Sequence, residues 1–254
     1  MSPDPSAPAH LALDTSGPVG SVALAVEGHV LARRFLDDRR AHAERVVPAV
    51  DAVLEEAGYD RREIAGVVVG AGPGSFTGVR IAAATAKGLA RGLACPLWAF
   101  SSLAAAALGD AVLPWRAGPW PPSPDLETPS PDEIAGAPRY VLFDARGTRV
   151  YAGCWTPVAG ELKERMPARA TGLEDVLSGE IPEGAVFGGE GALRHRDRIR
   201  RAGHRVLPAP AGMPTADGLL RLFAMERDHP LSEVDPSWEP EYLRASSAER
   251  ERTA

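Results

Sequence analysis

Apolar and polar positions along the first quarter of the chain predict three strands and then a helix. The first strand begins near His10 and ends in the polar turn Asp14-Thr15-Ser16, and further strands are expected at 19–27 and 30–36. Apolar residues then recur at helical spacing from about residue 41 to 57, and Gly58 is expected to end this helix. The chain therefore begins as a β-meander covered by one helix.

A glycine-rich turn, residues 70–78, follows a fourth apolar strand at 64–69 and precedes a helix of small residues. Thr77 is the expected N-cap of this helix, which would run from about Gly78 to Gly92. Backbone N–H groups at such a start can bind an anion, so the turn is either a phosphate site or simply a tight strand-to-helix connection. The spacing fits neither a P-loop, since Lys87 lies inside the helix, nor a dinucleotide fingerprint, nor a nucleophile elbow around Ser75.

The second half of the chain repeats the pattern of the first. A strand at 95–100 and a short helix near 102–107 complete the order βββαβαβα, and the proline-rich stretch 113–138 interrupts it. We expect the tryptophans of this stretch, Trp115 and Trp120, to lie in a loosely packed loop. Beyond it, residues 140–147 repeat the aspartate-ended strand of residues 11–17, and residues 185–191 repeat the strand-to-glycine pattern of 67–72.

This weak internal duplication predicts an α/β chain with the actin-like ATPase fold (ASKHA, ribonuclease H-like), in two lobes of related βββαβα plan. We expect a tail at 1–9, an N-terminal lobe at 10–108, a linker or insertion at 109–139, a C-terminal lobe at 140–245 and a frayed tail at 246–254. In such a fold the turns after the first strand of each lobe line a cleft and approach a nucleotide. The candidate cleft residues are Asp14, Thr15, Ser16, Gly72, Gly74, Ser75, Asp144 and Gly189. Asp14 has a simpler alternative, an Asx-turn that closes the first hairpin.

Composition limits the function more than the fold. The 254 residues are 44% hydrophobic and 24% charged, which is enough for two lobes with real cores. The chain has no apolar segment suited to a membrane or a signal peptide, so we expect a cytoplasmic location. The net charge of −6 argues against broad attraction to nucleic acid. The basic run 194–205 is either a contact for an RNA backbone or a solvated helix, and we expect the solvated helix. Cys95 and Cys154 lie too far apart in sequence to indicate a zinc site.

Six segments spread over almost the whole chain resemble the TsaB (YeaZ) family. They are Asp14-Thr-Ser, His42 with the apolar helix after it, Gly72-Pro-Gly-Ser-Phe-Thr-Gly-Val-Arg-Ile81, Ala86-Lys-Gly-Leu-Ala90, Phe143-Asp-Ala-Arg, and Pro240-Glu-Tyr-Leu-Arg244. The resemblance implies a noncatalytic subunit that docks on its paralogue TsaD and works with the ATPase TsaE to make N6-threonylcarbamoyladenosine at position 37 of tRNA. It implies no catalytic cofactor on this chain, ATP or ADP and a metal in the partner complex, tRNA bound through that complex, and a homodimer where TsaD is absent.

The same resemblance bears on metal chemistry. TsaD carries a His-x-x-x-His pair on the helix after the fifth strand, and two imidazoles at that spacing share one helix face and can hold a metal ion. The corresponding positions here are Ser102 and Ala106, so no metal site is expected. Two other function classes stay open, an ATPase or sugar-kinase-like enzyme and a metallopeptidase. ATP turnover, or bound metal with peptide cleavage, by the isolated chain would distinguish them.

The helix after the glycine-rich turn carries a small residue at every fourth position. The ridge consists of Gly78, Ala82, Ala86 and Ala90. It either admits a partner helix at close range or packs on the chain's own sheet. The family uses this helix and the preceding one in a four-helix contact with TsaD, so the resemblance favours a partner interface that adds Val46, Val50 and Val53. On this interpretation Ala86→Arg would break docking and leave the chain folded.

Overall fold

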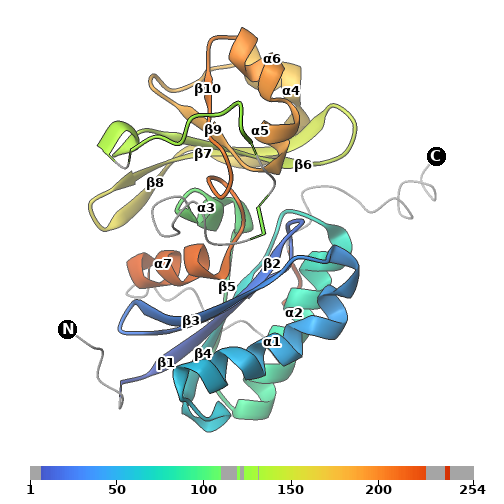
Figure 1. Ribbon diagram of the computed structural model, residues 1–254, viewed down its shortest axis with the longest axis vertical. Coiled ribbons are helices and arrows are strands. Elements are labelled where there is room, and N and C mark those ends of the chain that lie inside the picture. Colours follow the sequence, from blue (N-terminus) through green and yellow to red (C-terminus); the bar gives the residue numbers. More distant parts are fainter. Residues whose placement is uncertain (1–6, 110–118, 121–122, 131, 227–237, 241–254) are drawn as a thin grey trace.

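Two five-stranded sheets form the two lobes of the protein (Figure 1). The computed structural model describes residues 7–109, 119–120, 123–130, 132–226 and 238–240. The first sheet contains β1 (Ala9–Asp14), β2 (Gly20–Val26), β3 (His29–Leu36), β4 (Ile64–Gly70) and β5 (Leu97–Phe100), in the order β3-β2-β1-β4-β5. Helices α1 (His42–Ala57) and α2 (Phe76–Leu93) cover one face of this sheet, and α3 (Ser102–Ala106) follows β5 toward the second lobe.

The second sheet repeats the topology of the first. It contains β6 (Arg139–Asp144), β7 (Arg149–Val158), β8 (Glu161–Gly172), β9 (Val186–Gly188) and β10 (Arg205–Val206), in the order β10-β9-β6-β7-β8. Its helices are α4 (Leu173–Leu177), α5 (Glu190–Arg194), α6 (Arg196–Arg201) and α7 (Ala216–Glu226). In both sheets the first strand pairs antiparallel with the second and parallel with the fourth. The predicted duplication, and with it the actin-like fold, is confirmed.

Local sequence patterns predict most of the helices and strands of the first lobe. Helix α1 ends where Gly58 adopts the left-handed conformation with φ of 73°, as the sequence predicts. The N-cap of α2 is Ser75 and not Thr77, because the Ser75 hydroxyl accepts a hydrogen bond from the N–H of Gly78. Strand β8 and helix α7 are additional to the predicted elements. β8 is an edge strand that alternates exposed charged positions with half-buried ones, which gives a weak apolar signal.

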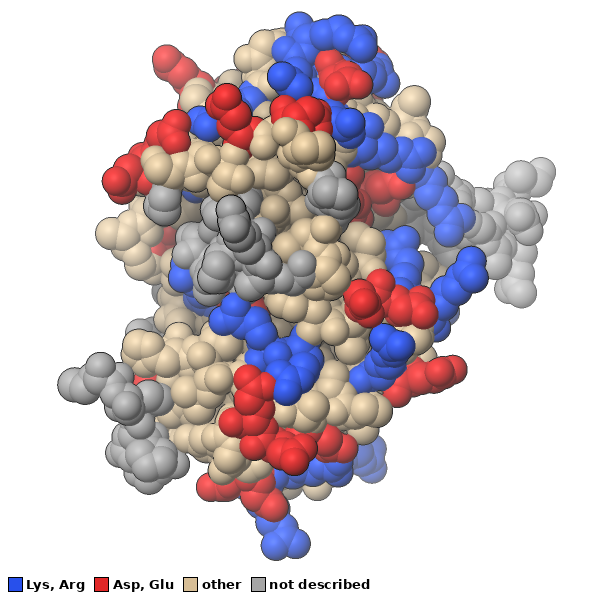
Figure 2. All heavy atoms as spheres, viewed as in Figure 1, with Lys and Arg blue, Asp and Glu red and all other residues tan. Residues whose placement is uncertain are grey.

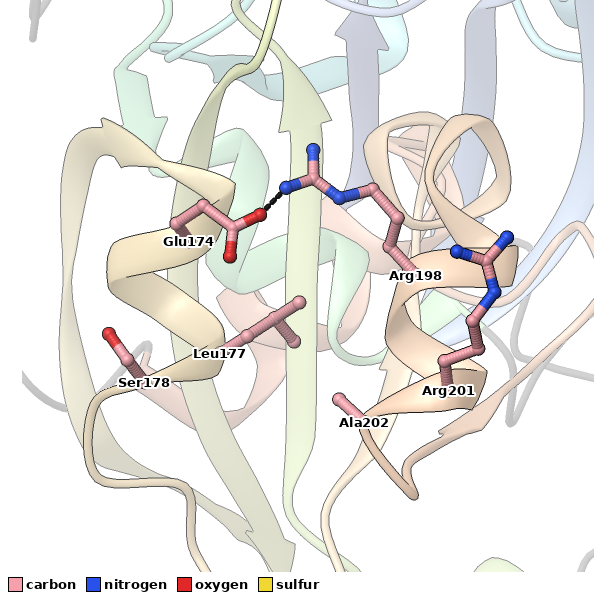
Figure 3. A pocket seen from close by; sticks show the side chains of 6 residues that line it. All are labelled: Glu174, Leu177, Ser178, Arg198, Arg201 and Ala202. Atoms are coloured by element: carbon pink, nitrogen blue, oxygen red, sulfur yellow. Dashed lines mark ion pairs between the residues drawn. The ribbon is translucent and has the colours of Figure 1, made fainter.

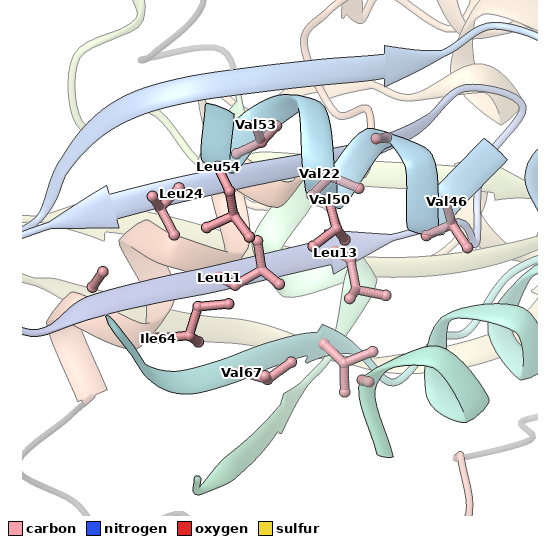
Figure 4. Close-up of a cluster of buried hydrophobic side chains, with 14 of the residues drawn as sticks. Leu11, Leu13, Val22, Leu24, Val46, Val50, Val53, Leu54, Ile64 and Val67 are labelled. Carbon is pink, nitrogen blue, oxygen red and sulfur yellow. The ribbon is translucent and has the colours of Figure 1, made fainter. Parts of the chain in front are cut away.

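The hydrophobic core has two main layers. The first lies between the first sheet and helices α1 and α2, where Leu11, Leu13 and Leu24 face Val50 and Leu54 (Figure 4). The second lies between the lobes. There, α3 and α7 pack between the two sheets and join side chains of both lobes: Ala12, Val68, Phe100, Leu103, Val141, Phe143, Trp155, Leu219 and Leu222 (Figure 1). The lobes therefore share one continuous apolar layer.

One buried ion pair holds α7 against the first sheet. The carboxylate of Asp217 is fully buried in the first turn of α7, 3.2 Å from the guanidinium of Arg33 on β3. Burial raises the pKa of Asp217, and the nearby Arg33 opposes that effect. Although α7 follows the second lobe in sequence, it packs on β1, β2 and β4 of the first. This helix thus ties the end of the described chain back to its beginning.

The described part of the proline-rich insertion is docked on the lobes. The ring of Trp120 packs edge-on against Phe35 of β3, with centroids 5.1 Å apart, and Trp120 and Leu126 also contact the core of the second lobe. Ile134 is buried beside Leu207. The prediction of a loosely packed loop is wrong for Trp120, because its ring bridges the two lobes; Trp115 lies outside the described residues.

We predict that Trp120→Ala lowers the free energy of unfolding by about 1 to 2 kcal/mol, because it removes a half-buried ring from both lobes at once. Chemical denaturation followed by circular dichroism measures this change. Val158→Ala, at an exposed position on β7, is the control and should change the value by less than about 0.5 kcal/mol. Equal stability of the two variants would show that Trp120 does not brace the lobes.

Candidate closed nucleotide cleft

The turn after β1 is built around the carboxylate of Asp14. Asp14 is fully buried, and its Oδ1 accepts hydrogen bonds from the backbone N–H of Ser16 at 2.7 Å and from the Ser16 hydroxyl at 2.6 Å. The first of these closes an Asx-turn, so that alternative is confirmed. Its Oδ2 accepts a hydrogen bond from the hydroxyl of Ser102, at 2.7 Å. Both carboxylate oxygens therefore have partners within the protein.

Ser102 connects this carboxylate to the glycine-rich turn. It is the first residue of α3 and is fully buried. Its hydroxyl donates to Asp14 and accepts a hydrogen bond from the N–H of Gly72 at 3.2 Å. In the sequence, Ser102 stands out only as the replacement for a metal ligand. No local sequence pattern indicates its hydrogen bond to Asp14, because 88 positions separate the two residues.

Burial dominates the electrostatics of the turn. It raises the pKa of Asp14, and the hydrogen bonds from Ser16 and Ser102 oppose the rise because they favour the ionised form. Burial also lowers the pKa of His42, whose Nε2 lies 3.2 Å from the carbonyl oxygen of Leu36. A metal ion bound to Asp14 would have to displace the hydroxyl groups of Ser16 and Ser102. Within the described part of the chain, no three Asp, Glu, His or Cys side chains are grouped as a metal site requires.

The glycine-rich turn packs directly on the Asp14 turn. The N–H of Ser75 donates to the carbonyl oxygen of Ser16 at 2.8 Å, and the Thr15 hydroxyl donates to the carbonyl oxygen of Gly78 at 2.6 Å. A Cβ at Gly78 would collide with the backbone of Thr15, so this close approach requires glycine. The N–H groups of Ala71, Gly72, Ser75 and Gly78 all donate within the protein. The structure thus brings six of the candidate residues together, and they contact one another. They are Asp14, Thr15, Ser16, Gly72, Gly74 and Ser75.

The corresponding turn of the second lobe is filled in the same way. The N–H of Arg146 donates to Asp144 Oδ1 at 2.9 Å, and Arg194 forms an ion pair with the same carboxylate. Gly189 has φ of 97°, and its N–H donates to the carbonyl oxygen of Ala211 at 2.9 Å. A Cβ there would lie 2.5 Å from the carbonyl oxygen of Leu142. Asp144 and Gly189 therefore lie at the ends of two neighbouring strands, β6 and β9, and Gly188 and Gly189 pack against the chain's own 211–212 segment.

Glu190 is a further acidic residue, directly after Gly189, and it is not among the candidate residues predicted from the sequence. It begins α5, and its Oε2 is buried with no hydrogen-bond partner among the described residues. Burial raises the pKa of Glu190 to about 7, and the repulsion of Asp144 adds to the rise. Arg39 of the first lobe and backbone N–H groups oppose it. No local sequence pattern indicates this burial, because it depends on how the lobes meet.

The predicted interface residues lie inside the first lobe. The ridge of Gly78, Ala82, Ala86 and Ala90 faces the chain's own sheet, and the α1 side chains Val46, Val50 and Val53 are at most 1% exposed. These side chains cannot contact a partner while the core is intact, and Ala86→Arg would disrupt the fold. The predicted interface used the wrong ridge because α2 carries two ridges of small residues. The ridge exposed to solvent is the second one, which consists of Ala84, Gly88 and Gly92.

The exposed face of α1 and α2 is apolar and flat near its centre. Val47 is 44% exposed and is one of the two exposed large hydrophobic residues of the described chain. On α1 the opposite border carries Arg45 and Glu56, which pair with Asp37 and Arg34 near β3. Val47 therefore lies on the border of α1 that is nearer to α2, where the Ala84 and Gly88 ridge continues the surface.

Two duplicated lobes, each with a closed aspartate turn and a closed glycine turn, define a member of the actin-like class of proteins. The family model described as "TsaD: tRNA N6-adenosine threonylcarbamoyltransferase" matches residues 29–116. The tRNA threonylcarbamoyladenosine biosynthesis protein TsaB of Bacillus subtilis is 30% identical over 191 residues, which cover 74% of each chain. The Haemophilus influenzae TsaB is 41% identical over 97 residues, covering 38% of this chain and 41% of that protein.

Solved structures agree with this assignment. The structure of YeaZ from Pseudomonas aeruginosa superposes with a TM-score of 0.71 at 29% identity, covering 92% of this chain and 99% of the other. The chain belongs to the TsaB (YeaZ) family, whose curated members are proteins of tRNA threonylcarbamoyladenosine biosynthesis. No helix in the described part of the chain has the length and apolar character needed to cross a membrane.

We predict that Glu190→Gln removes one component of the pH dependence of stability. In the native state Glu190 keeps its proton up to about pH 7, whereas in the unfolded chain it ionises near the ordinary value of 4.5. The native state thus binds more protons between these values, so the contribution of Glu190 to the free energy of unfolding falls as pH rises from 4.5 to 7. The glutamine variant should be more stable than the parent at pH 8 by about 2 kcal/mol and no more stable at pH 4. Parallel stability curves from denaturant titrations between pH 4 and 8 would contradict this.

Proposed function

We propose that this chain is a noncatalytic subunit of the complex that forms N6-threonylcarbamoyladenosine at position 37 of tRNA. It docks on TsaD through the first lobe and supports TsaD, which carries out the chemistry together with TsaE. The observation that carries the proposal is the carboxylate of Asp14, which is fully buried and accepts hydrogen bonds from Ser16 and Ser102. A catalytic actin-like protein needs an acidic group at this turn that is free to reach a nucleotide's metal.

Three further features support the absence of catalysis by this chain alone. Ser102 and Ala106 occupy the positions where the family's catalytic paralogue has metal-binding histidines, and both are fully buried. The N–H groups of Gly72 and Ser75 in the glycine-rich turn already donate to Ser102 and Ser16, so an anion that used them would have to displace these partners. The second-lobe turn is packed against Ala211 and Gly212. ATP or ADP and a metal ion are therefore assigned to the partner complex.

The exposed face of α1 and α2 is the surface that best fits a helical partner. Val47 supplies an apolar side chain at its centre, and Ala84 and Gly88 leave the α2 backbone accessible. Small residues let a second pair of helices approach closely, and the apolar area then provides the driving force. TsaD is the proposed occupant. In its absence a second copy of this chain could use the same face to form a homodimer.

We predict that Val47→Glu weakens association with TsaD at least tenfold, because it places an ionised group where apolar surface would be buried. Co-purification and surface plasmon resonance measure the effect. Val158→Glu is the matched control, since Val158 is 42% exposed and lies on β7 of the other lobe. The two variants should have the same circular dichroism spectrum. Equal binding by both variants would exclude the α1 and α2 face as the docking surface.

Reconstitution tests the function itself. TsaD and TsaE, incubated with ATP, an activated threonylcarbamoyl donor and unmodified tRNA, should form N6-threonylcarbamoyladenosine only when this chain is added, as measured by mass spectrometry of nucleosides. The isolated chain should hydrolyse no ATP, because the carboxylate of Asp14 is buried and already accepts hydrogen bonds from Ser16 and Ser102. Product formation that does not depend on this chain would reject the proposal, and ATP turnover by the isolated chain would favour a kinase-like enzyme.

A further inference from the structure

A groove of about 370 Å³ lies between α4 and α6 on the second lobe, far from the α1 and α2 face (Figures 1 and 3). Leu177 and Ala202 provide its apolar part, and Ser178 adds a hydroxyl group. Arg198 and Arg201 extend into it from α6. These two arginines are three positions apart, so they lie on the same side of the helix and both reach one small region.

The two arginines differ in their partners. Arg198 forms an ion pair with Glu174, whose side chain is 71% exposed, whereas no acidic partner of Arg201 lies among the described residues. An ion pair between groups this exposed contributes little to stability, so an incoming anion can replace Glu174 at little cost. The groove thus offers two guanidinium groups and a hydroxyl to an anion, with one guanidinium already free of a carboxylate.

The segment of the second lobe from β6 to β10 is the basic part of an acidic chain. Residues 139–206 contain 12 Lys and Arg against 9 Asp and Glu, a net charge of +3, although the whole chain has −6. Figure 2 shows Lys and Arg side chains gathered over the end of the molecule where Figure 1 places α6. On another side of α6, Arg196 and Arg200 bind Asp125 of the insertion. Arg196 and Arg200 share this one carboxylate, whereas Arg198 and Arg201 are the arginines of α6 that line the groove.

We propose that the groove between α4 and α6 is a contact site for the phosphate backbone of RNA, an inference that rests on the proposed role in tRNA modification. Guanidinium groups pair with phosphate in a bidentate geometry, and a hydroxyl group adds a further hydrogen bond. The groove has no aromatic side chain on which a base could stack, so it reads the backbone and not the sequence. The site would orient tRNA from the lobe opposite to the docking face.

Binding of fluorescent tRNA to the full-length chain, alone and with TsaD, tests this inference. We expect the variant Arg198→Ala/Arg201→Ala to bind about tenfold more weakly at 0.1 M salt and to lower the salt slope, the dependence of log affinity on log salt concentration, by about 2. The variant Arg198→Lys/Arg201→Lys should keep most of that slope because it keeps both charges. Ser178→Asp should weaken binding without removing either arginine.

The control removes equal charge from the same lobe. Lys163 and Arg165 are exposed residues of β8, the edge strand at the other end of the sheet from β10. Lys163→Ala/Arg165→Ala should retain tRNA affinity within about twofold. If both double-alanine variants lose the same amount of tRNA affinity, the effect is general electrostatics and the inference is overturned. It is also overturned if neither variant alters tRNA affinity. Continued co-purification with TsaD separates a failure of this groove from a failure of the docking proposal.

Discussion

The carboxylate of Asp14 is buried where β1 meets the glycine-rich turn, and its burial constrains the surrounding structure. A charge in this position is costly unless donors surround it, and Ser16 and Ser102 provide them. The hydrogen bond from Ser102 fixes the start of α3, and the close contact between Thr15 and Gly78 fixes the start of α2. The carboxyl ends of parallel strands are where α/β proteins usually bind ligands, and here that edge is occupied by the protein's own atoms.

One apolar layer joins the two lobes. Helices α3 and α7 lie between the sheets, and Phe100, Phe143 and Trp155 belong to the same apolar cluster. The Arg33–Asp217 ion pair and the ring of Trp120 add links between segments distant in sequence. Separating the lobes would expose this apolar surface to water.

Acidic residues of the proline-rich insertion form ion pairs with basic residues of the second lobe. Asp125 binds Arg196 and Arg200, and Glu133 lies 3.7 Å from Arg205. The basic run therefore holds an acidic segment of its own chain, while Arg198 and Arg201 face the groove beside α4. The proposed docking face and the proposed RNA contact lie on different lobes, so one molecule could engage both partners at once (Figure 1).

The sequence by itself determined the order of most elements, the duplication and the Asx-turn at Asp14. These follow from local patterns: apolar periodicity, Gly58 after a helix, and an aspartate at the end of a strand. It did not determine which ridge of α2 faces the sheet, because small residues occur on both sides, at Ala82 and Ala86 and at Ala84 and Gly88. Only the tertiary structure decided that, as it decided the Asp14–Ser102 hydrogen bond, the burial of Glu190 and the place of Trp120. Each depends on contacts between residues far apart in the chain, and such contacts leave no periodic pattern in the sequence.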